Sequence, residues 1–324
     1  MGSLRFLLAC VVLLSHLGVR VYGLNPGVTA VVIFYLLAGH VVAGLWGKWC
    51  HQPNALVHFY KDRFFRIAPQ YAMAMMLSAL LWLNGASSPF ISVKPTILDW
   101  MSNIFIIPLN YYMYTGQDGF TLIPPAWSLA TEVQFYLLAP LLLMSKTRLM
   151  LKICFGLSIL IFTLAQAQCL SADYFGYRLL PGILFIFLIG VLQEQRLKYK
   201  NLTEALVALW LLNVYYFFGI LMADASYVPF RKEVSLGLML AMPLLLGLST
   251  HKIASLPVLG RSLDKNLGAL SYGVFLYHFP VMWSLKWEQS GIVSTEMIIV
   301  AILTVSVSAF GHWCIERPLW KRFR

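Results

Sequence analysis

The sequence predicts an all-α polytopic integral membrane protein with about ten transmembrane helices and one long outer loop. Hydrophobic residues make up 60% of the 324 residues, charged residues only 11%, and the mean hydropathy is +0.74. A soluble protein carries about 25% charged residues. The charges are therefore too few to solvate a globule, and most of the surface must face lipid.

Apolar segments recur along the whole chain, separated by charged or Pro- and Gly-rich breaks. Because a crossing takes about 20 residues, the length accommodates roughly ten of them. The predicted helices lie near residues 4–22, 28–46, 69–84, 129–145, 150–167, 179–193, 203–222, 234–250, 269–285 and 293–313. We interpret residues 1–324 as one integral-membrane domain, with no soluble domain.

The one long connection between predicted helices is residues 85–127. It is rich in prolines and aromatic residues, and its apolar stretch 96–107 is too short to span a bilayer. A re-entrant or interfacial segment is the natural interpretation. Long loops inside compact proteins are often functional.

The distribution of Lys and Arg predicts the orientation. With the N-terminus in the cytoplasm, 18 of the 24 cationic residues fall on cytoplasmic segments and six on outer ones. Such an excess marks the cytoplasmic side, so we expect both termini there. The outer six are Arg20, Lys94, Arg178, Arg231, Lys232 and Lys286. The net charge of +11 is therefore mainly a topology signal, and we expect no nucleic-acid partner.

The first apolar segment carries two ionisable residues, Arg5 and His16. Eleven helical residues rise roughly 16 Å and turn about 1100°, close to three full turns, so both side chains lie on one stripe. An intramembrane histidine is often an interhelical hydrogen-bonding residue, but it is also a candidate for function. Burial favours the neutral imidazole, which can act as a general base.

A basic segment precedes the third predicted helix, which Pro69 opens. Arg63 and Arg66 are three residues apart and share a helical face. Such a pair can attract anionic lipid or fix topology. It also suits a polyphosphate ligand, because each guanidinium can bind phosphate oxygens with two hydrogen bonds.

The helix at 129–145 begins with three polar residues at a spacing of four, Ser128, Glu132 and Tyr136. They share a face near the outer end of the span. A buried carboxylate needs a partner or becomes protonated. His16 and Arg5 are both candidate partners for Glu132, and a purely structural role is the alternative.

The C-terminal third adds His278, in the outer half of the ninth predicted helix, and a Glu316-Arg317 pair at the end of the tenth. Helix packing through a hydrogen bond is the simpler role for His278, and Arg317 is interpreted as a topology anchor. His312 and Cys314 lack partners at metal-ligand spacing. We therefore expect no metal site.

Taken in order, these stretches resemble the membrane acyltransferase family 3, which includes O-acetyltransferases of O-antigen and other cell-surface sugars. Arg5 and His16 match its first-helix Arg-x10-His, and RFFR at 63–66 matches its cytoplasmic Arg-x-x-Arg. WSLATEVQFYLLAP at 127–140 resembles its Trp-Ser-Leu signature. IFYLLAGH at 33–40, LSYGVFLYHFP at 270–280 and ERP at 316–318 resemble further family motifs.

The resemblance implies an acyl-CoA donor, with acetyl-CoA expected, that binds from the cytoplasm as a substrate, without a bound cofactor. The acceptor would be a hydroxyl of a glycan or lipid-linked sugar, and the location a bacterial inner membrane. His16 would be the catalytic residue, supported by Glu132, while Arg5, Arg63 and Arg66 would bind the donor. Ser128, Tyr136 and His278 would support the substrate or the site.

Two features depart from the family pattern. The second-helix motif commonly has Ser before its Gly and an aromatic residue after it, where this chain has Ala38 and His40, so no role is assigned to that helix. The C-terminal SGNH-type extension of some members is also not expected here.

Two other functions remain open from the residues alone. A transporter or channel would also place ionisable residues within the membrane, although no internal repeat of the kind common in transporters is apparent. A non-catalytic membrane subunit of a polysaccharide assembly complex is the second alternative.

Overall fold

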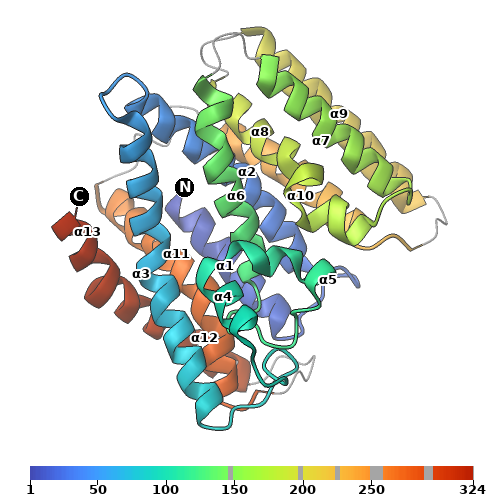
Figure 1. Ribbon diagram of the computed structural model, residues 1–324. Helices are drawn as coiled ribbons and strands as arrows, with labels where there is room; N and C mark the ends of the chain where they lie inside the picture. The colour runs from blue at the N-terminus through green and yellow to red at the C-terminus, as the bar shows by residue number, and fades with distance from the viewer. Residues whose placement is uncertain (145–148, 196–199, 223–226, 249–257, 288–294, 324) are drawn as a thin grey trace. The chain divides into compact units, whose positions relative to one another are not determined.

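The computed structural model describes residues 1–144, 149–195, 200–222, 227–248, 258–287 and 295–323 (Figure 1). Within these ranges the regular secondary structure is helical, and the only β-pairs are two isolated bridges. The longer helices are α1 (Gly2–His16), α2 (Pro26–Trp49), α3 (Ala55–Leu83), α6 (Ala126–Met144), α7 (Leu149–Gln166), α8 (Leu180–Gln195), α9 (Lys200–Met222), α10 (Arg231–Leu248), α11 (Val258–Ser284) and α12 (Thr295–Phe310).

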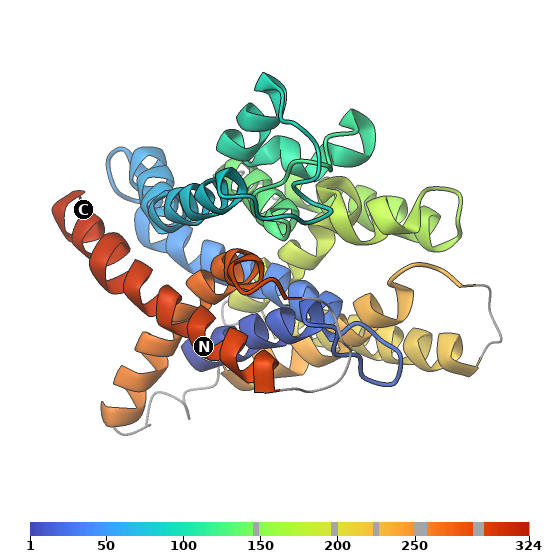
Figure 2. The same ribbon diagram turned by 90° about the horizontal axis from the view of Figure 1, so that it is seen from below.

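The shorter elements lie in the connections and at the C-terminus. The outer loop holds α4 (Ile97–Phe105), η1 (Ile107–Tyr111) and α5 (Tyr112–Thr115), and η2 (Tyr174–Arg178) precedes α8. In the red C-terminal segment, α12 continues through η5 (Gly311–Glu316) into α13 (Arg317–Phe323), as Figure 2 shows.

A helix overlaps each of the ten predicted ranges, and the prediction of a helical polytopic membrane protein is confirmed. Among the described residues, seven helices are long and apolar enough to cross a membrane, and α1 is a shorter apolar helix. The number of crossings and a re-entrant segment in the outer loop stay predictions. The predicted helix ends at 145, 249–250 and 293–294 lie outside the described residues, as do Lys146, Arg148, Arg196, Lys198, Lys252 and Arg324 of the predicted charge pattern.

Three predicted boundaries are wrong: the end of the first helix, the start of the third, and the start of the ninth, because α11 begins at Val258 and not at residue 269. Helix α1 ends at His16, six residues before the predicted end, because Gly18 takes a left-handed conformation with φ of 101°. Arg20 then donates hydrogen bonds to the Ser15 and Val19 carbonyls, which satisfies the end of the helix. Helix α3 begins at Ala55 instead of Pro69, so Pro69 lies inside the helix and not at its start.

The chain forms two compact units. Unit 1 comprises Met1–Arg20, Tyr60–Val133 and Val258–Arg324, and unit 2 comprises Val21–Phe59 and Gln134–Pro257. Helix α6 passes from unit 1 into unit 2 after Val133.

In unit 1, α1 packs alongside α11 and runs in the same direction. At one end the backbones touch, because a methyl group on Gly268 would collide with Gly2. At the other end His16 contacts His278. These helices are the first and ninth predicted spans, so a shared direction is what alternate crossings require.

Helix α3 also runs parallel to α11, as expected for the third span. Tyr272 donates a hydrogen bond to the Ile67 carbonyl, 3.2 Å away, and Tyr277 donates one to the Gln70 carbonyl, 3.4 Å away. The order of contacts along both helices is therefore the same.

In unit 2, α2 and α8 approach closely through glycines. A side chain on Gly39 would collide with the Phe187 carbonyl, and one on Gly190 with the Leu36 carbonyl. Small residues let membrane helices pack backbone against backbone. Ala38, beside Gly39, is buried in the same region. The departure from the family pattern at position 38 therefore falls in a tightly packed helix.

Helices α9 and α10 of unit 2 run in opposite directions, as consecutive spans must. Trp210 donates to the Met239 carbonyl at 2.9 Å, and Asn213 donates to the Ser235 carbonyl at 3.0 Å. The later residue of α9 therefore meets the earlier residue of α10.

The outer loop is organised around Asn103, which is fully buried. Its amide nitrogen donates to the Asp99 and Phe120 carbonyls at 2.9 and 3.0 Å, and its amide oxygen accepts from the Leu122 backbone at 2.8 Å. Tyr71 of α3 donates to the Asn103 carbonyl at 2.6 Å. The loop is thus tied to unit 1 by satisfied polar groups.

We predict that Gly190→Val destabilises the protein by about 1–3 kcal/mol, because the added side chain meets the α2 backbone and cannot move it cheaply. Gly219→Val is the matched control, since a side chain there meets nothing within 4 Å. Thermal unfolding in detergent measures both. Equal melting temperatures for the two variants would contradict the close contact of α2 and α8.

Candidate active site

The two histidines of unit 1 meet where α1 ends. The Nδ1 atom of His16 lies 2.9 Å from Nε2 of His278, although 262 residues separate them in sequence. His278 has no exposed surface, whereas His16 is partly exposed. The structure therefore brings together two of the predicted site residues that the sequence could not pair.

Phe279 links this histidine pair to the outer loop. Its ring centroid is 5.1 Å from that of His16 and 5.4 Å from that of Phe90. Phe279 also belongs to an apolar cluster with Ile91 and Phe120 of the loop. The outer loop is thus packed directly beside the histidine pair.

Arg66 lies in a buried polar network at the other end of the same helices. Its guanidinium pairs with the Glu316 carboxylate at 2.7 Å, and its charge lies over the Tyr272 ring, 5.6 Å from the centroid. Glu316 also accepts a hydrogen bond from Gln70 and lies 2.9 Å from Nδ1 of His312. Glu316 is only 5% exposed. This carboxylate therefore holds three side chains together.

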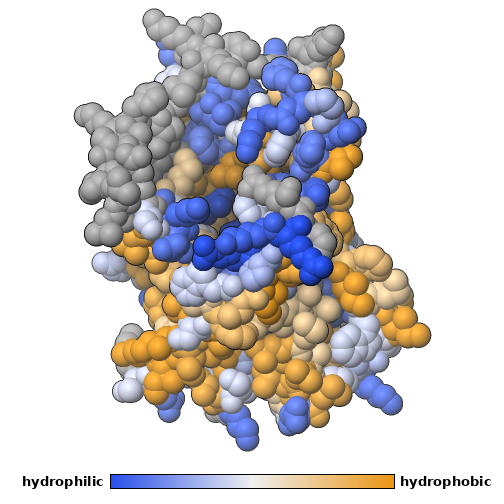
Figure 3. Space-filling view, turned by 90° about the vertical axis from the view of Figure 1, so that its left-hand side faces the viewer, coloured by the Kyte–Doolittle hydropathy of each residue, from blue (hydrophilic) through white to orange (hydrophobic). Residues whose placement is uncertain are grey.

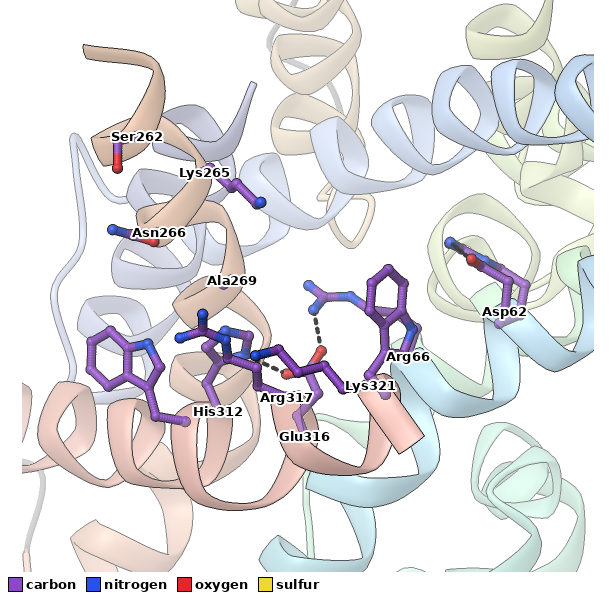
Figure 4. Close-up of a pocket in the computed structure, with 13 residues that line it drawn as sticks. Asp62, Arg66, Ser262, Lys265, Asn266, Ala269, His312, Glu316, Arg317 and Lys321 are labelled. Carbon is purple, nitrogen blue, oxygen red and sulfur yellow. Dashed lines mark hydrogen bonds and ion pairs between the residues drawn. The ribbon is translucent and has the colours of Figure 1, made fainter. Parts of the chain in front are cut away.

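A pocket of about 470 Å³ opens beside this network (Figure 4). Five cationic side chains and two acidic ones line it, together with two tryptophans. The cationic residues are Arg63, Arg66, Lys265, Arg317 and Lys321, and the acidic ones are Asp62 and Glu316. On the face that carries α13, Figure 3 shows hydrophilic side chains gathered around a hollow. The surplus of positive charge suits a polyanionic ligand.

The two predicted phosphate-binding arginines both have acidic neighbours. Arg63 pairs with Asp62 at 2.6 Å, and Arg66 pairs with Glu316. Among the described residues, no other acidic side chain lines this pocket. The charge surplus therefore comes from Lys265, Arg317 and Lys321, which the sequence did not indicate as a set.

The predicted residues of α6 fall in different surroundings. Ser128 is buried and donates its hydroxyl to the Pro125 carbonyl at 3.0 Å, where it supports the start of the helix. Glu132 lies close enough to Tyr272 for an electrostatic interaction. Tyr136 is buried in unit 2. Support of His16 by Glu132 stays a prediction, as do substrate roles for Ser128 and Tyr136.

Arg5 lies on α1 with His16, so the two are roughly 16 Å apart along the helix axis. It is partly buried. Its predicted contact with the donor stays a prediction.

A family profile for the acyltransferase domain, acyltransferase 3, matches residues 2–313 of this chain. The chain belongs to the acyltransferase 3 family. The resemblance noted in the sequence is thereby confirmed.

Two relatives of this acyltransferase 3 protein extend the comparison. One is an uncharacterized protein from Aquifex aeolicus (strain VF5), 33% identical over 205 residues that cover 61% of this chain and 88% of the relative. The other is nodulation protein 10 from Rhizobium leguminosarum bv. viciae, 24% identical over an alignment of 359 positions that covers 98% of this chain and 92% of the relative. No solved structure gives a significant match.

Gln70, His312 and Glu316 form a network in this acyltransferase that the sequence patterns did not predict. One signal was present, because His312 and Glu316 are four residues apart and so share a helical face. A carboxylate near a span end needs a partner, but only the fold shows that Arg66 supplies it.

We predict that Glu316→Met destabilises the protein by about 3 kcal/mol, since it leaves Arg66 without its carboxylate in a largely buried position. Arg66→Met alone should also destabilise it. The double variant Arg66→Met/Glu316→Met should be more stable than the sum of the single effects implies, because apolar residues can replace a buried pair. Chemical unfolding of the four proteins in detergent measures the coupling. Strictly additive effects would contradict the ion pair.

Proposed function

We propose that this protein transfers an acyl group, acetyl in the simplest case, from cytoplasmic acyl-CoA to a hydroxyl of a sugar in a cell-surface glycan or lipid-linked precursor. Membership of the acyltransferase 3 family supports acyl transfer in general. One arrangement supports an acyl-CoA donor and the role of His16: the basic pocket and the histidine pair are built on the two ends of α11.

The separation of the two sites suits a long, flexible donor. Ala269 lines the pocket and His278 belongs to the pair, and the nine helical steps from one to the other span roughly 14 Å. A donor with its phosphates in the pocket can extend its pantetheine arm along this helix toward His16. The thioester is then close to the base while the charged end stays at the membrane surface.

The charge distribution supports a cytoplasmic pocket. All five cationic lining residues come from segments that the positive-inside rule assigns to the cytoplasm. The opposite end of α11 packs against the outer loop through Phe279. Donor and acceptor would therefore approach His16 from opposite sides of an inner membrane, with both chain termini inside.

Two routes are compatible with a histidine in this place. In the first, the acceptor hydroxyl gives its proton to His16, its oxygen forms the ester bond, the C–S bond breaks, and the thiolate takes the proton from His16. In the second, a His16 nitrogen forms a bond to the acyl carbon and the thiolate leaves. The acceptor oxygen then forms the ester bond as the bond from the acyl carbon to His16 breaks, and the hydroxyl proton goes to the thiolate. Both need a His16 nitrogen with a lone pair.

We predict that His16→Ala abolishes acylation and leaves acetyl-CoA binding intact, because the side chain takes part in the chemistry and not in the donor pocket. Mass spectrometry of surface glycans from cells that make either protein measures the product, and calorimetry on purified protein measures binding. His51→Ala, at an exposed histidine, is the control. Normal glycan acylation with His16→Ala would contradict the proposal.

We also predict that Arg63→Ala and Lys321→Ala each weaken acetyl-CoA binding by about tenfold, since a hydrogen bond to a charged group contributes about 1.5–3 kcal/mol. Lys61→Ala is the matched control, because Lys61 is exposed and does not line the pocket. Titration calorimetry in detergent measures the affinities. Unchanged affinity in both variants would return these residues to the role of topology anchors.

A further inference from the structure

The hydrogen-bond partners of His278 determine which of its nitrogens carries hydrogen. Its Nδ1 atom lies 3.1 Å from the Val274 carbonyl oxygen, one helical turn earlier. A carbonyl oxygen can only accept a hydrogen bond. Nδ1 of His278 must therefore be the protonated nitrogen that donates.

The second nitrogen of His278 is consequently an acceptor. The side chain has no exposed surface, and burial without a charged partner favours the neutral ring. A neutral imidazole has one N–H and one lone pair. Because Nδ1 carries the hydrogen, the lone pair of His278 lies on Nε2, the atom that faces His16.

The relative placement of the two rings fits a hydrogen bond in their plane. The ring planes are 11° apart, the centroids are 5.0 Å apart, and the two facing nitrogens are 2.9 Å apart. The distance between the two nitrogens is therefore much shorter than the distance between the two ring centroids. Nearly parallel rings with this geometry lie almost edge to edge, and one nitrogen can donate to the other in the ring plane. Nδ1 of His16 must supply the hydrogen that Nε2 of His278 accepts.

We propose that His278 is the positioning residue that fixes the tautomer of His16, so that Nδ1 of His16 carries the hydrogen and Nε2 carries the reactive lone pair. The order is Val274 carbonyl, His278, His16, with each ring donating through Nδ1. The hydrogen bond at one ring nitrogen sets the protonation of the other. This inference rests on the proposed role of His16, and it names the reacting atom for both routes described above.

The surrounding structure keeps the His16 ring in this orientation. Phe279 packs against both imidazoles, with centroids 5.1 Å from His16 and 5.0 Å from His278. Arg20 closes the helix end that carries His16 by bonding the Ser15 carbonyl. A fixed ring and a fixed tautomer are what a base or nucleophile needs to act on one atom.

A pair of substitutions at His278 tests the role by activity. His278→Gln keeps a carbonyl oxygen that can accept from His16 and an amide that can donate to Val274, whereas His278→Leu removes both. We expect kcat with acetyl-CoA to fall between about 10² and 10⁴-fold in the Leu variant, with KM for acetyl-CoA unchanged. The Gln variant should retain kcat within about tenfold of the parent protein. His51→Gln is the control.

Nitrogen NMR tests the tautomer without any turnover. In purified protein labelled with ¹⁵N-histidine and placed in lipid, the His16 signals are those lost in His16→Ala. We expect a protonated Nδ1 and an unprotonated Nε2 for His16 in the parent protein and in His278→Gln, and loss of this preference in His278→Leu. A His16 signal with hydrogen on Nε2 in the parent protein would overturn the inference.

The two measurements separate this inference from the proposed function. If the parent protein shows the expected nitrogen signals but transfers no acyl group, the proposed function fails and the tautomer assignment stands. If it transfers acyl groups and His278→Leu has the same kcat and nitrogen signals as the parent protein, the assignment to His278 fails. If His278→Leu does not fold, the His16 nitrogen signals of the parent protein and of His278→Gln still test the tautomer assignment.

Discussion

The parallel contact of α1 with α11 is the constraint on which the site depends. Gly2 and Gly268 let the two backbones touch, and the Asp264 carboxylate of α11 accepts hydrogen bonds from the Gly2 and Ser3 backbone at 3.1 and 2.8 Å. A carboxylate at a helix N-terminus satisfies its unpaired donors and favours its dipole. With one end fixed in this way, the equal rise of two parallel helices brings His16 level with His278.

Helix α11 carries two groups of residues that need different environments in a membrane. Near its start Lys265 and Asn266 line a basic pocket, and near its end His278 faces His16. The pocket must keep its charges close to water, since charged groups are costly inside a bilayer. The histidines can lie deeper because each satisfies the other. One helix thus carries both the charged pocket and the histidine pair on which the proposed function rests.

Hydropathy predicted the helices well because lipid imposes one requirement on every span. It did not predict the end of α1, which depends on the left-handed Gly18 and on the Arg20 hydrogen bonds. It also did not predict that α3 continues through Pro69, because packing in the folded protein overrides a local helix-breaking preference. His16 and His278 were each identifiable as unusual residues within apolar segments, but 262 residues separate them. Their pairing is a property of helix register, and a single sequence carries no signal for it.

The place of Glu316 explains how a basic site can exist before a ligand binds. Arg66 and Glu316 are both largely buried, and an arginine there without a partner would carry the full cost of desolvation. Glu316 offsets that cost and also contacts Gln70 and His312, so the Glu316 carboxylate that lines the pocket has partners on three side chains. A phosphate that enters would therefore compete with Glu316 for Arg66, while Lys265, Arg317 and Lys321 supply charge that neither lining carboxylate pairs with in the structure. In the proposed function, Arg66 would therefore stay paired with Glu316, and Lys265, Arg317 and Lys321 would supply most of the attraction for an anionic donor.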